Sequence, residues 1–63
     1  MHSIKSSREI AQISESQMAK LIGVSIEKYR RYECYDEEMS VEQAMIFSRR
    51  VNIPIDNIIF FAH

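Results

Sequence analysis

Apolar and small residues recur at helical spacing along most of the chain, and short polar segments divide them into separate helices. The first helix is predicted over roughly residues 3–12, with an inward face made of Ile4, Ser7 and Ala11. A second helix is predicted from Ser14, because Ser14 and Gln17 have the spacing of a capping box. Gly23 is expected to end this helix, since a residue without a Cβ adopts the left-handed C-terminal conformation at little cost.

A third helix is predicted to start at Ser25, which can cap it only two residues after Gly23. Tyr29 and Tyr32 lie three positions apart and are expected on its inward face. A helix that ends at Gly23 and another that begins at Ser25 must cross at a steep angle. The pattern therefore predicts a helix-turn-helix.

Two further helices are predicted in the second half of the chain. Ser40 and Gln43 repeat the capping-box spacing and open a fourth helix that should stop near Asn52. Its inward side is expected to carry Val41, Ala44, Met45, Phe47, Ser48 and Val51. Pro54 suits the first turn of a short fifth helix, because its missing amide hydrogen would have no partner there. The inward residues of that helix would be Ile55, Ile58 and Ile59.

The composition indicates a small globular protein that gains from pairing. The chain has 63 residues, of which 46% are hydrophobic and 27% charged, so one domain over residues 1–63 with a marginal core is expected. One Gly and one Pro are too few for the turns of a β-sandwich, which favours an all-α fold of five helices. A second copy would bury further apolar surface, so a homodimer is expected on stability grounds.

The sequence also limits location and chemistry. No apolar run approaches the ~20 residues needed to cross a bilayer, and the N-terminus lacks a secretory signal, so a cytoplasmic protein is expected. An enzyme is not expected, because there is no glycine-rich phosphate loop and the histidines, His2 and His63, lie at the chain ends. Cys34 has no nearby histidine to activate it and cannot complete a zinc site. We therefore expect no catalytic residue, metal or cofactor.

One set of residues matches the pattern of a known family: Gln17-Met18-Ala19-Lys20-Leu21-Ile22-Gly23-Val24-Ser25, then Tyr29, Tyr32 and Glu33. It resembles the phage repressor and Cro type of helix-turn-helix domain, also called the xenobiotic-response-element family. The likeness covers nearly the whole chain, up to the segment 51–58. The resemblance implies a compact five-helix, lambda-repressor-like fold, a structural ion pair between Arg8 and Glu33, and a transcription regulator that binds an operator as a dimer.

In this architecture the third helix lies in the major groove of double-stranded DNA. Because Tyr29 and Tyr32 point inward, the 3.6-residue period determines which side chains point outward. Ile26 would contact a thymine methyl, Glu27 would accept from cytosine N4, and Arg31 would donate to guanine O6 and N7. Contacts to the DNA backbone are expected from Ser25, Lys28 and Arg30. The same set is also compatible with an ordinary solvated helix face.

Four features depart from the family's DNA-binding pattern. The net charge is −1, and Glu15 stands where the family usually has a glutamine. The loop after the third helix carries the carboxylates of Asp36, Glu37 and Glu38, which phosphates repel. Tyr35 replaces a glycine common at this turn. These features imply either a DNA contact of limited affinity or a different partner. The acidic loop favours the alternative of a protein-interaction module, similar to an antirepressor, that binds another regulatory protein.

Surplus apolar side chains bear on both hypotheses. Ile26, Ile46, Phe60 and Phe61 suit a surface for a different protein, which is the second hypothesis. For the DNA-binding hypothesis, Ile46, Phe60 and Phe61 are expected to form the seam of the homodimer. Such a dimer should prefer a pseudo-palindrome with half-sites about 34 Å apart. A chain that stays monomeric in gel filtration at several concentrations would count against the operator-binding dimer and favour binding to another protein.

Overall fold

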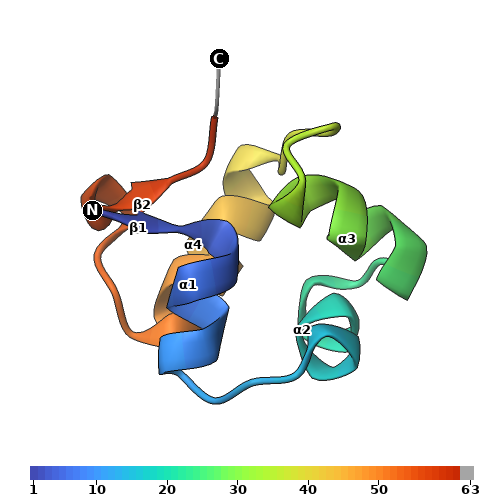
Figure 1. The fold of residues 1–63 in the computed structure, drawn as a ribbon, viewed down its shortest axis with the longest axis horizontal. Helices are drawn as coiled ribbons and strands as arrows, with labels where there is room; N and C mark the ends of the chain where they lie inside the picture. The colour runs from blue at the N-terminus through green and yellow to red at the C-terminus, as the bar shows by residue number, and fades with distance from the viewer. Residues whose placement is uncertain (62–63) are drawn as a thin grey trace.

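Four α-helices make up most of the molecule (Figure 1). The computed structural model describes residues 1–61. The helices are α1 (Ile4–Ile10), α2 (Glu15–Ile22), α3 (Ile26–Glu33) and α4 (Val41–Val51). A 3-10 turn, η1 (Ile55–Asn57), follows, and strands β1 (His2–Ser3) and β2 (Ile58–Ile59) pair in parallel. The chain is therefore a compact, mostly helical domain with one very small sheet.

Side-chain caps set the helix starts. A serine precedes each α-helix, and its hydroxyl accepts from the backbone amide three residues later. At Ser14 and Ser40 the following glutamine also accepts from the serine's own amide, so both predicted capping boxes are present. Gly23 ends α2 in the left-handed conformation, with φ 79°, and Asn52 ends α4 in the same way, with φ 57°. The boundaries predicted for these two helices are confirmed.

The mostly helical character is confirmed, but the predicted fifth helix is wrong, because a 3-10 turn and a two-residue strand take its place. After Pro54 the chain makes one 3-10 turn, in which the amide of Asn57 donates to the carbonyl of Pro54 at 2.8 Å. It then becomes extended, as the β-branched pair Ile58 and Ile59 favours. Helical periodicity cannot reveal this, because two isoleucines in a row fit a helix and a strand equally well.

The two strands bring the ends of the described chain together. His2 lies opposite Ile58, and Ser3 lies opposite Ile59. Ile58 is buried, whereas Ile59 and Ile55, which were expected to face inward, are each 39% exposed. For Ile59 this difference arises because alternate residues of a strand point to opposite sides, so only one of the two neighbouring isoleucines can enter the core. Ile55 lies in the 3-10 turn.

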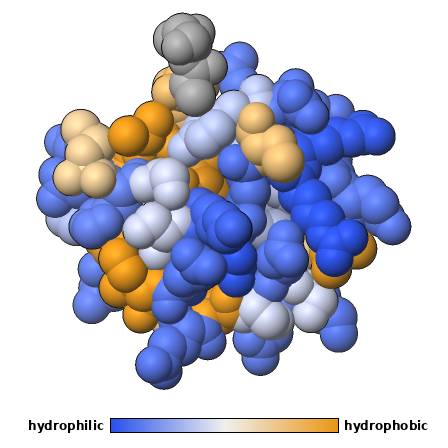
Figure 2. Space-filling view, in the orientation of Figure 1, coloured by the Kyte–Doolittle hydropathy of each residue, from blue (hydrophilic) through white to orange (hydrophobic). Residues whose placement is uncertain are grey.

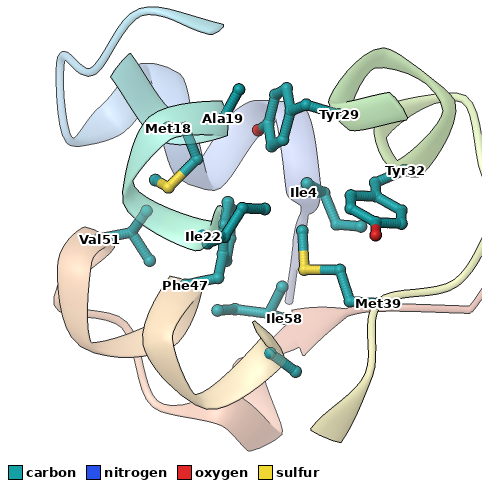
Figure 3. Packing of buried hydrophobic residues seen from close by; sticks show 11 residues of the cluster. Ile4, Met18, Ala19, Ile22, Tyr29, Tyr32, Met39, Phe47, Val51 and Ile58 are labelled. Carbon is teal, nitrogen blue, oxygen red and sulfur yellow. The ribbon is translucent and has the colours of Figure 1, made fainter. Parts of the chain in front are cut away.

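One hydrophobic cluster lies where the helices meet (Figure 3). Its largest fully buried side chains include Tyr29 and Tyr32, whose rings meet edge to face with centroids 6.5 Å apart. In Figure 3 the α3 tyrosines lie on one side of the cluster, which also contains Ile22 of α2 and Phe47 of α4. The inward stripe of α4 is formed by Ala44, Phe47 and Val51. Val41 and Met45 lie outside this stripe and are exposed, contrary to the prediction.

Tyr35 connects the loop after α3 to both ends of the chain. Its backbone has a φ of 62°, a left-handed conformation that non-glycine residues adopt uncommonly. Its hydroxyl accepts from the amide of Ile4 at 3.3 Å and donates to the carbonyl of Ile59 at 2.7 Å. The side chain thus serves two backbone groups that a glycine would leave without this partner.

Within residues 1–61, no helix combines the length and the apolar character that a bilayer crossing requires. The longest helix, α4, has 11 residues and carries charged side chains near both ends. A bilayer crossing needs about 20 predominantly apolar residues.

Tyr35→Phe is expected to lower the free energy of unfolding by roughly 1 kcal/mol, because it removes one hydroxyl that serves two backbone groups. Urea denaturation followed by far-ultraviolet circular dichroism measures the change. An unchanged midpoint would show that this hydroxyl contributes nothing to holding the chain ends together.

Candidate nucleic-acid interface

A tight turn joins α2 to α3 on one side of the molecule (Figure 1). The amide of Val24 donates to the carbonyl of Ala19 at 2.9 Å, which closes α2, and Ser25 then caps α3. Ala19 is 3% exposed. Its small side chain allows the two helices to approach closely, which this turn requires. The turn fixes the direction in which α3 leaves α2.

The two faces of α3 differ sharply in exposure. Tyr29 and Tyr32 are 0% and 1% exposed and form its rear. Lys28, Arg30 and Arg31 are exposed on its other side, and the side chains of the two arginines are 58% and 60% exposed. Figure 2 shows hydrophilic side chains over the side of the molecule where α3 lies in Figure 1. The helix therefore presents three cations to solvent.

The first turn of α3 carries the other residues expected to meet DNA. Ser25 and Glu27 are exposed, and Ile26 is half-buried. The Ser25 hydroxyl accepts from the amide of Lys28 at 3.2 Å as the helix cap. Its hydrogen remains able to donate to a phosphate oxygen, because a hydroxyl accepts and donates at the same time.

Two carboxylates lie beside the arginines of α3. Arg30 Nε is 3.6 Å from Glu15 Oε2, and Arg31 Nη1 is 3.4 Å from Glu37 Oε1. Among residues 1–61, the ion pairs do not include Lys28. Both acidic residues are evident in the sequence, but their partners are not, since the pairings depend on how α2 and the loop pack around α3. The cationic face of α3 is thus partly neutralised within the chain.

The structure brings Arg8 and Glu33 together at the junction of α1 and α3. Arg8 Nε is 2.5 Å from Glu33 Oε2, and the side chains are only 11% and 8% exposed. Arg8 Nη1 also donates to the carbonyl of Ile13 at 2.9 Å, and the hydroxyl of Tyr29 donates to Glu33 Oε2 at 2.6 Å. One carboxylate therefore holds α1 and the rear of α3 in a fixed relation.

This network changes the protonation behaviour of its members. The hydrogen bond with Glu33 raises the pKa of Arg8 above its ordinary value, although burial acts in the opposite direction. Burial raises the pKa of Tyr29 far above its ordinary value, and the hydrogen bond to Glu33 adds to the effect. The folded state therefore favours the charged form of Arg8 and the protonated form of Tyr29.

The residues expected at a homodimer seam have unequal exposure. Phe60 is half-buried and meets Phe47 edge to face, with ring centroids 6.0 Å apart, so part of its surface is used within the chain. Ile46 is also half-buried, and Phe61 is 56% exposed. The more exposed apolar residues of α4 are Val41 at 76% and Met45 at 43%, which helical periodicity placed inward.

No group of three or more His, Cys, Asp or Glu side chains among residues 1–61 is placed to hold a metal ion. His63, one of the two histidines considered in the sequence, lies outside the described residues. Cys34 is exposed as the C-cap of α3.

No known protein family, curated protein or solved structure matches this chain. What the structure establishes is a compact, mostly helical domain with an exposed cationic helix face.

Glu33→Ala is expected to lower the free energy of unfolding by about 3 kcal/mol or more, because Arg8 and Tyr29 would lose their shared partner in a buried position. Urea denaturation measures the loss. Glu37→Ala is the matched control, since its ion pair with Arg31 is exposed and should be worth less than about 1 kcal/mol. Equal losses for the two variants would contradict the role given to Glu33.

Alkaline pH should destabilise the fold through Tyr29. The folded state holds the pKa of Tyr29 above its ordinary value of 10.0, so the unfolded chain releases this proton first as the pH rises. The contribution to stability is thus complete below pH 10 and is lost progressively above it. Unfolding measured between pH 9 and pH 11, with tyrosinate absorbance recorded in parallel, should show this fall. A fall of the same slope in Tyr29→Phe would rule out Tyr29 as its source.

Proposed function

We propose that this chain is a sequence-specific, DNA-binding transcription regulator that acts as a homodimer on a pseudo-palindromic operator. The observation that carries the proposal is α3, which exposes Lys28, Arg30 and Arg31 while Tyr29 and Tyr32 anchor its rear. A helix fits the major groove of B-DNA, which is about 12 Å wide. In this proposal α2, Gly23 and α3 form a helix-turn-helix of the phage repressor and Cro type.

Base reading is assigned to three outward residues of α3. Arg31 would donate two hydrogen bonds to guanine O6 and N7, Glu27 would accept from cytosine N4, and Ile26 would contact a thymine methyl. Arg31 must leave Glu37 to do so. An exposed ion pair contributes about 1 kcal/mol or less, whereas a bidentate arginine to guanine contact is worth about 1–3 kcal/mol, so the exchange is favourable.

Positioning on the phosphates is assigned to Ser25, Lys28 and Arg30. Lys28 has an exposed ammonium group, and Arg30 would exchange the Glu15 carboxylate for a phosphate oxygen. These contacts hold the helix in the groove but carry no sequence information. They also release counterions from DNA, so affinity should fall steeply with salt concentration.

The second candidate is a protein-interaction module that binds another regulatory protein. The observation that favours it is the pairing of Glu15 with Arg30 and of Glu37 with Arg31, which leaves a face of mixed charge on a chain of net charge −1. Such a face suits a protein of mixed charge better than a polyanion.

Selection from a random duplex pool separates the two candidates. The DNA-binding proposal expects enrichment of a pseudo-palindrome whose half-sites lie about 34 Å apart. Recovery of no sequence above the starting pool, at salt concentrations low enough to retain bulk DNA, would reject it and favour the protein-interaction module.

Arg31→Ala and Lys28→Ala should change binding to the selected duplex in different ways. Arg31→Ala should weaken specific binding by about 1–3 kcal/mol and relax the base preference at one position, because it removes a base contact. Lys28→Ala should weaken binding to all sequences alike and reduce the salt dependence. Fluorescence anisotropy on matched and mismatched duplexes measures both effects. Lys5→Ala removes an exposed cation of α1 and is the control. Identical effects of the first two variants on every duplex would overturn the assignment.

A further inference from the structure

The outer face of α4 carries an ordered stripe of side chains. Ala44, Phe47 and Val51 form the buried side of this helix. The opposite side carries Glu42, Met45, Ile46 and Arg49. Spacings of three, four and seven residues place them on one line along the helix. The stripe is acidic at its start, apolar in its middle and basic at its end.

The ends of the stripe have no partner within the described part of the chain. Glu42, Arg49 and Arg50 are exposed, and none of the ion pairs formed among residues 1–61 includes them. Val41 and Met45 beside them are 76% and 43% exposed. An amphipathic helix usually has polar residues on its outer side. Exposed apolar residues between opposite charges therefore indicate a surface that binds another molecule.

We propose that α4 pairs antiparallel with α4 of a second copy of this chain. The two-fold axis passes between Met45 and Ile46. Glu42 and Arg49 are equally far from this midpoint, so Glu42 of each chain faces the partner's Arg49. A stripe that is complementary to its own reversed copy fits a second copy of the chain, because a two-fold interface uses the same surface on both subunits.

The apolar centre supplies affinity, and the charges set the register. Burying Val41, Met45 and the outer part of Ile46 removes apolar surface from water on both chains. Ile46, Arg49 and Arg50 line a hollow of about 240 Å³ on this face, which can receive the partner's Met45 as a knob enters a hole. Exposed ion pairs add little energy, but they oppose the parallel orientation, in which like charges would meet.

This inference deepens the homodimer part of the proposed function. It moves the seam from Phe60, which packs on Phe47, to the outer face of α4. The experiment contains no DNA, so failure of the α4 interface and failure of operator binding are separate results.

Charge reversal in single and mixed chains tests the pairing. Sedimentation equilibrium should show wild-type dimers, whereas Glu42→Arg alone and Arg49→Glu alone should raise the dimer dissociation constant about tenfold or more, because like charges then meet twice in each dimer. An equimolar mixture of the two variants should associate again, since each acidic stripe then meets a basic one. The double variant E42R/R49E should also dimerise.

Controls keep the test independent of folding. Circular dichroism must show native helix content in each variant, and Met45→Lys provides a second disruption at the axis should either reversal unfold the chain. Glu9→Arg and Lys20→Glu reverse exposed charges on α1 and α2 and should leave the dimer intact. A wild-type monomer at all concentrations, dimers that persist in both reversals, or a mixture that stays monomeric would each overturn the proposal.

Discussion

The carboxylate of Glu33 is the contact on which the arrangement of this small protein depends. It receives the guanidinium of Arg8 from α1 and the hydroxyl of Tyr29 from its own helix, in a place almost closed to water. The two groups share one acceptor, so removing Glu33 takes a partner from both of them. Because this contact fixes the rear of α3, it also determines which side chains α3 presents to solvent.

Much of the fold follows from helix caps and helical periodicity, which can be recognised in the sequence. The caps at Ser14, Ser25 and Ser40, the end at Gly23 and the inward tyrosines need only neighbouring residues for their explanation, and the structure has them as predicted. The C-terminal segment differs, because β2 exists through its pairing with His2 and Ser3, which lie at the other end of the chain. Local periodicity contains no information about such a distant partner, so the segment after Pro54 was assigned to a helix.

The candidate site shows the same division. The outward direction of Lys28, Arg30 and Arg31 follows from helix geometry and was predictable. Their carboxylate neighbours were not, because Glu15 lies on another helix and Glu37 reaches α3 only through the turn at Tyr35. The exposure of Val41 and Met45 was also missed, since hydrophobic residues on an amphipathic helix are assigned inward unless a partner surface is known.

The parallel pairing of β1 with β2 has a consequence for how the chain is made. Residues 2–3 leave the ribosome before their strand partner at residues 58–59, and all four helices lie between the two strands in the sequence. Ile58 is also part of the core. The four helices alone therefore leave one side of the core open until residues 58–59 join it. Until then, the apolar surface that Ile58 covers in the folded protein stays open to solvent.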